Sequence, residues 1–125
     1  MASIDKGQAL YNFWATFGLP VYDEQTVPDE AEPPYITYET ITDSLGNSLP
    51  LTGSLWYRSN SWEDITKKAQ QIANYIGQGG VNLAYDGGSL WITRGASFAQ
   101  RIADPNDDGI RRIYININAE YLGSH

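Results

Sequence analysis

The sequence predicts an α+β protein in which two helices pack on a mainly antiparallel β-sheet, in the order α-β-β-α-β-β-β. Three observations lead to this fold class. A one-sided helix is predicted from Ser61 to Gln78, β-rich runs lie before and after it, and short turns join consecutive runs. Short turns favour antiparallel pairing, and a helix with one apolar stripe must cover an apolar surface such as a sheet.

The helix from Ser61 to Gln78 is the clearest element. Ser61 is predicted as its N-cap, because a Ser hydroxyl can accept a free backbone N–H of the first turn. Gly79-Gly80 is predicted to end it, since Gly tolerates left-handed geometry. The apolar residues recur at three- and four-residue steps and form one stripe: Trp62, Ile65, Ala69, Ile72, Ala73 and Ile76.

A first helix is predicted near the N-terminus, with Ser3 or Asp5 as its cap and Gly18 as its stop. Its apolar face carries Leu10, Phe13, Trp14 and Phe17. Two interpretations remain open. The helix either covers the core, or part of its aromatic surface docks on another subunit, because interfaces favour Trp, Tyr and Phe.

The segment from Val21 to Pro34 differs sharply in composition from its surroundings, because prolines and carboxylates alternate along it. Repeated Pro and like charge oppose both helix and sheet. An extended arm or long loop is therefore predicted here. It is either a solvated surface loop or a segment that orders against a neighbouring subunit.

A hairpin is predicted next, from the β-rich runs Pro34–Thr42 and Leu49–Ser59. In the second run Leu49, Leu51, Leu55 and Tyr57 share one face at period two, whereas Trp56 falls on the other face. The sheet is therefore expected to be covered on both sides, by the helices on one side and by something else on the other.

The C-terminal third predicts three more strands and one loop. Residues 81–85 and 89–95 are joined by Asp86-Gly87-Gly88, a tight-turn signal. A loop is predicted from Ala96 to Gly109, followed by a strand in which apolar and polar residues alternate from Ile110 onward.

The composition excludes several kinds of chemistry. The chain has 125 residues, enough for one domain spanning 1–125, with no Cys and a single His, which is His125. Ser-His and Cys-His nucleophile pairs and thiolate metal sites are therefore excluded, and neither an enzyme nor a cofactor is expected. The net charge of −7 argues against direct binding to nucleic acid. No membrane-spanning stretch or signal peptide is recognisable, so the chain is expected to be soluble and unprocessed.

One motif suggests a cation. Residues Asp104 to Gly109 fit the opening D-x-[DN]-x-[DN]-G of a calcium loop. The twelfth position, however, is Ile115 instead of Glu, and it lies in a predicted strand. A polar turn is therefore the preferred interpretation, and no metal is expected.

Several phrases of the sequence resemble a known family: ALYNFWATFGLPVYDEQTVP, PYITYETITDS, LWYRSNSWEDI and DGGSLWITRGASFAQRIADPNDDGIRRIYININAEYL. They are similar to the tail terminator proteins of long-tailed bacteriophages, also called tail completion or minor capsid proteins. The resemblance covers nearly the whole chain, without a catalytic signature.

The resemblance implies a virion protein of the tail or neck, assembled in the host cytoplasm. Such a protein forms a homo-hexameric ring that caps the tail tube protein, ends tube polymerisation and meets the head–tail connector or stopper proteins, while the genome passes through. An acidic ring would not hold the DNA. A head-completion stopper and an unrelated small monomeric binding domain remain as alternatives.

Two sets of candidate residues follow. The candidate subunit or partner contacts are Phe13, Trp14, Phe17, Tyr22, Trp56, Phe98 and Arg101. The candidate channel-facing acids are Asp23, Glu24, Asp29, Glu30, Asp107 and Asp108.

Overall fold

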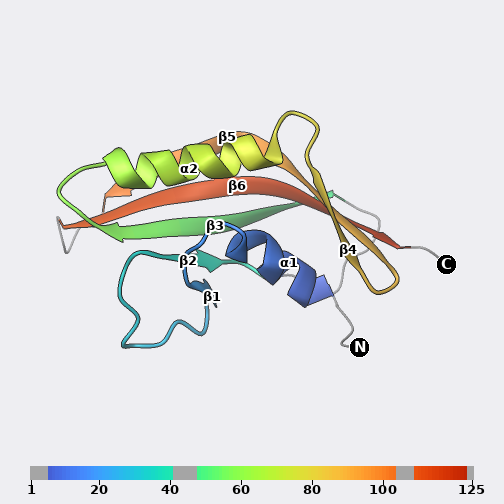
Figure 1. The fold of residues 1–125 in the computed structure, drawn as a ribbon, viewed down its shortest axis with the longest axis horizontal. Helices are drawn as coiled ribbons and strands as arrows, with labels where there is room; N and C mark the ends of the chain where they lie inside the picture. Colours follow the sequence, from blue (N-terminus) through green and yellow to red (C-terminus); the bar gives the residue numbers. More distant parts are fainter. Residues whose placement is uncertain (1–5, 41–47, 104–108, 124–125) are drawn as a thin grey trace.

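The computed structural model describes residues 6–40, 48–103 and 109–123. Two helices and six strands follow one another along these residues (Figure 1): α1 (Lys6–Ala15), β1 (Val21–Asp23), β2 (Tyr35–Tyr38), β3 (Ser48–Arg58), α2 (Glu63–Ile76), β4 (Val81–Tyr85), β5 (Gly88–Ala103) and β6 (Ile110–Gly123). The α+β prediction is confirmed, with one short strand, β1, added to the predicted order.

The six strands form one sheet in the order β1-β2-β3-β6-β5-β4. Every neighbouring pair is antiparallel except β1 and β2. β6 is central because it pairs with β3 and with β5 along most of its length. The alternation of apolar and polar residues in β6 thus corresponds to the two faces of the sheet.

Both helices cover the same face of this sheet. The rings of Phe17, in the turn just after α1, and of Tyr75 in α2 lie 5.4 Å apart, edge to face. Beneath the helices the inward residues of β3 and β6 are buried, among them Leu51, Leu55 and Ile115. Figure 1 shows α2 running along the long strands β5 and β6. The core therefore lies between the two helices and one face of the sheet.

The ends of α2 differ from the prediction. The helix begins at Glu63, although the Ser61 hydroxyl still accepts the N–H of Glu63 at 3.0 Å. It ends at Ile76, and Gly77 has a φ of 66° while its N–H donates to the Ala73 carbonyl at 2.9 Å. Gly77 therefore supplies the left-handed residue that was assigned to Gly79-Gly80.

The predicted loop from Val21 to Pro34 was wrong at its start, because Val21–Asp23 forms β1 and Val21 is buried. Residues 24–34 are irregular, as predicted. The helix caps Ser3 and Asp5 lie outside the described residues.

The predicted loop from Ala96 to Gly109 was wrong over its first half, because β5 continues to Ala103. The register between β5 and β6 shifts between Arg94 and Ala99, and Ser97 has a φ of 51°. A bulge of this kind breaks the period-two pattern that identifies a strand. Beyond the bulge, Arg101 lies on the helix-covered face and Ile102 on the open face. A charged residue thus occupies the covered face and an apolar residue the open face, the reverse of the usual arrangement in a half-buried strand.

Candidate interaction surfaces

The described residues form no recognisable metal centre. No three His, Cys, Asp or Glu side chains among them are grouped to bind an ion. The calcium-like motif lies outside the description except for Gly109, whose carbonyl accepts the Ser59 N–H at 2.8 Å. Neither described helix is long and apolar enough to cross a bilayer.

The first surface is on the sheet face opposite the helices. Four adjacent strands contribute an aromatic–arginine cluster, which consists of Tyr22 of β1, Tyr35 of β2, Trp56 of β3, and Arg112 and Tyr114 of β6. The register aligns them, because Tyr35 is opposite Trp56 and Trp56 is opposite Arg112. All five are only partly buried, and no described element of the chain covers them.

Ring and cation contacts hold this cluster together. Tyr22 and Tyr35 lie edge to face with centroids 5.6 Å apart, and Tyr35 and Trp56 lie 6.3 Å apart. The Arg112 guanidinium sits 4.5 Å from the Trp56 ring centroid and 5.0 Å from that of Tyr114. Such stacking fixes the side chains without burying them.

Two buried hydroxyl groups of the sheet, those of Thr37 and Ser54, accept hydrogen bonds from the cluster. The indole Nε1 of Trp56 donates to Thr37 Oγ1 at 2.9 Å, and Nε of Arg112 donates to Ser54 Oγ at 3.1 Å. Thr37 and Ser54 are only 6% and 4% exposed, so these bonds satisfy polar groups that water cannot reach freely. Trp56 and Arg112 are therefore held in fixed positions on the open face of the sheet.

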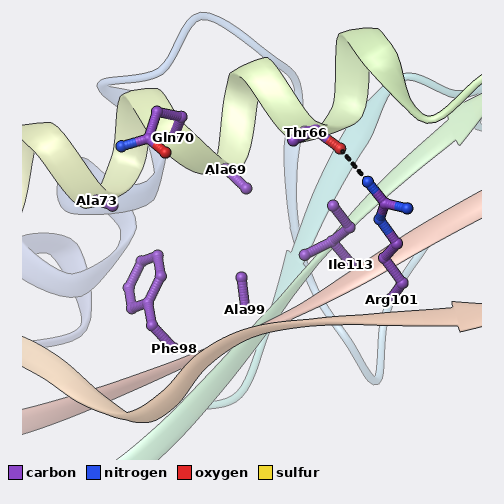
Figure 2. Close-up of a pocket in the computed structure, with 8 residues that line it drawn as sticks. All are labelled: Thr66, Ala69, Gln70, Ala73, Phe98, Ala99, Arg101 and Ile113. Atoms are coloured by element: carbon purple, nitrogen blue, oxygen red, sulfur yellow. Dashed lines mark hydrogen bonds between the residues drawn. The ribbon is translucent and has the colours of Figure 1, made fainter.

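The second surface is a pocket between α2 and β5, called the α2–β5 pocket here (Figure 2). Its volume is about 220 Å³, and its lining is mostly apolar: Thr66, Ala69, Gln70, Ala73, Phe98, Ala99, Arg101 and Ile113. In Figure 2 Phe98 and Ala99 rise from β5 toward α2, and Arg101 stands at the end of the pocket with its guanidinium next to Thr66.

The Arg101 guanidinium is exposed and is held from two sides. Its Nη2 donates to Thr66 Oγ1 at 3.4 Å, and the group lies 5.1 Å from the centroid of Trp62. Arg111 approaches the same indole at 5.3 Å. Within the described part of the chain no carboxylate pairs with Arg101. The pocket thus combines an apolar floor with a guanidinium that no carboxylate of the described residues neutralises.

The predicted contact residues have different outcomes. Phe13, Trp14 and Phe17 are at most 2% exposed, so these three rings belong to the core and are not accessible to a partner in this structure. Tyr22 and Trp56 are brought together through Tyr35.

The remaining predicted contacts, Phe98 and Arg101, line one pocket. Sequence reasoning missed Tyr35, Arg112 and Tyr114. The strand register alone aligns them with Trp56, and no local pattern carries that information.

The predicted channel-facing acids are only partly described. Asp23 accepts the Gln25 N–H at 2.9 Å and the Thr40 hydroxyl at 3.4 Å, so it stabilises the start of the loop. Glu24, Asp29 and Glu30 are exposed in the segment 24–34. Asp107 and Asp108 lie outside the described residues.

Comparison with known proteins adds one likeness. The fold is similar to a chain in the structure of the "Virion of native gene transfer agent (GTA) particle", with a TM-score of 0.59 and 20% identity over 90% of this chain and 91% of that chain. At this identity the likeness shows a shared fold. No protein-family model and no curated protein matches the chain.

Proposed function

We propose that this chain is a structural protein of a phage-like virion, built as a single domain and without enzymatic activity. The observation that carries the proposal is the fold shared with a chain of a virion particle over about nine-tenths of both chains. The two exposed surfaces support it, because both have the aromatic and Arg composition that dominates binding energy at protein interfaces.

Within the virion we propose the role of tail terminator, a homo-hexameric ring that caps the tail tube and joins it to the head connector. Heterologous contacts that close by rotation generate rings, and they require two different complementary surfaces on each copy. The aromatic–arginine cluster and the α2–β5 pocket lie on opposite faces of the sheet. The cluster and the pocket therefore provide more than one candidate contact surface on each copy, toward a neighbour, the tube or the connector.

The charge of the chain fits a ring around a genome. A net charge of −7 repels phosphate and opposes the counterion exchange that retains DNA. We propose that exposed acids such as Glu24, Asp29 and Glu30 contribute to this repulsion. Reversing Glu24 to Lys, with Asp29 and Glu30 left unchanged, is expected to slow genome ejection while tails remain morphologically complete.

Electron microscopy of tails tests the function directly. The purified chain, added to uncapped tubes, is expected to stop their elongation and to appear as a six-membered ring at the head-proximal end. Binding to the head connector without an effect on tube length would favour the head-completion stopper instead. A chain that stays monomeric by light scattering at high concentration and leaves tubes uncapped would contradict both roles.

A further inference from the structure

The segment 24–34 and the α2–β5 pocket have complementary properties. Glu24, Asp29, Glu30 and Glu32 are all exposed, and within the described residues none of them forms an ion pair. Arg101, at the pocket, likewise lacks a carboxylate partner there. Among the residues that the structure describes, the carboxylates at one place and the guanidinium at another are therefore both without an ion-pair partner.

The acidic segment is ordered before any partner arrives. Thr26 N–H donates to the Asp23 carbonyl at 3.0 Å, and Ala31 N–H donates to the Pro28 carbonyl at 3.1 Å. The second bond closes a turn whose two central residues are Asp29 and Glu30, so both carboxylates stand at its tip. Preordering lowers the entropic cost of docking this turn.

The size and lining of the pocket suit such a turn. A volume of about 220 Å³ is smaller than the ~300–1,000 Å³ typical of small-molecule sites and fits one or two side chains. Pro28 is exposed and Val27 is half-buried, so the acidic tip carries its own apolar residues. Pro28, next to the carboxylates at the tip of the turn, therefore complements the apolar pocket floor next to Arg101.

In this fold the segment lies far from the pocket of its own chain. It leaves from β1, at one edge of the sheet, whereas the pocket lies over β5, four strand positions away. That separation is roughly 19 Å at the usual strand spacing. In Figure 1 the segment also extends away from the side of the sheet where α2 lies.

We propose that the acidic segment 24–34 of one copy docks in the α2–β5 pocket of a second copy, with Pro28 on the apolar floor and Asp29 or Glu30 paired with Arg101. This contact joins two different surfaces, so it can propagate around a ring. The inference rests on the proposed ring, for which it names the contact between neighbours.

Cysteine cross-linking tests the contact in the isolated chain. The natural sequence has no Cys, so one copy with Ala31→Cys and one tagged copy with Gln70→Cys can link only to each other or to their own kind. Under mild oxidation at high concentration, this mixed pair is expected to link at least about tenfold more than a control pair of Asp86→Cys with Gln70→Cys. Equal yields for the two pairs would overturn the inference.

Charge reversal identifies the pairing. Arg101→Glu in the Gln70→Cys copy, or Asp29→Lys with Glu30→Lys in the Ala31→Cys copy, is expected to lower the linked fraction roughly tenfold, as for a central interface residue. Combining the two reversed copies is expected to restore it. Arg94→Glu, the same change at another exposed Arg of β5, is the matched control and is expected to have no effect.

These results are separable from the proposed function. Capped tubes without specific cross-linking would overturn the contact and leave the terminator role standing, whereas specific cross-linking without capping would do the reverse. If Arg101→Glu abolished capping but left cross-linking unchanged, the pairing of Arg101 with Asp29 or Glu30 would be wrong, and Arg101 would contact another virion protein.

Discussion

The two faces of this sheet are built from alternate residues of the same strands, yet they have different roles. On the covered face, Trp14 of α1 is 1% exposed and packs directly against Gly53 of β3. Because Gly53 has no side chain, the indole ring can approach the strand closely. On the open face, Trp56 is half-exposed and stacks between Tyr35 and Arg112. The same residue type therefore serves packing at one position and exposed stacking at the other.

With the binding role proposed for the open face, this difference would separate stability from recognition in a small chain. Core packing is close and responds to a change of one methyl group, whereas a half-buried ring loses less area when it is removed. Substitutions on the covered face should therefore lower stability, and substitutions on the open face should mainly affect binding. Four predictions test this comparison.

The largest expected effect is that of Trp14→Ala. Removing this side chain leaves a cavity above Gly53 that the surrounding strands cannot fill, which should cost about 3–5 kcal/mol of the free energy of unfolding. Denaturant titration followed by circular dichroism measures the loss. A cost below about 1 kcal/mol would show that the covered face is not the stabilising one.

Gly53→Ala is expected to have the next largest effect. A Cβ at this position would lie 2.5 Å from Cη2 of Trp14, so the ring must shift, at a cost of about 1–3 kcal/mol. Gly79→Ala is the matched control, because a Cβ there meets nothing within 4 Å. In the Trp14→Ala background the cost of Gly53→Ala should largely disappear, since the two residues are coupled. Additive costs would contradict the direct contact.

Much of the fold could be predicted from the sequence, because its periodicities are local. The stripe of α2 and the alternation in β6 were both visible. The prediction was wrong for β5 beyond Gly95, which was predicted as a loop. There the bulge and the positive φ of Ser97 move the residues that follow to the opposite face of the sheet from the one that period-two alternation predicts. Only the pairing with β6 identifies residues 99–103 as a strand.

The candidate surfaces were predicted less completely, for a related physical reason. Trp56 was recognised as an outward aromatic, but its neighbours Tyr35 and Arg112 lie on other strands, and register determines their position. The opposite error concerned Phe13, Trp14 and Phe17. An apolar helix face looks the same in a sequence whether it covers a core or a partner.

Trp56→Ala is expected to have a smaller effect on stability than either covered-face substitution. It removes a half-buried ring and the donor to the buried Thr37 hydroxyl, which together should cost about 1 kcal/mol. Capping of tail tubes, counted by electron microscopy, should nevertheless be lost. Trp91→Ala is the matched control, since Trp91 is an exposed Trp on the same face outside the cluster. Equal loss of capping in both variants would contradict a specific role for the cluster.

The smallest effect is confined to alkaline pH and again concerns the covered face. Burial, followed by the nearby phenols of Tyr85 and Tyr38, raises the pKa of Tyr121 above its ordinary value of 10.0. Burial is also the main cause of the raised pKa values of Tyr38 and Tyr57, which lie on the same face.

A raised pKa means that the folded chain keeps the phenol proton to higher pH than the unfolded chain does. The stabilisation from Tyr121 is therefore complete below pH 10.0 and is lost as the pH rises through the higher pKa of the folded state. The melting temperature should fall above pH 10, and Tyr121→Phe should make that fall shallower, because Phe has no proton to lose. The difference between the two proteins at pH 7 corrects for lost contacts of the hydroxyl. Parallel melting curves across the alkaline range would show that Tyr121 titrates alike in the folded and unfolded states.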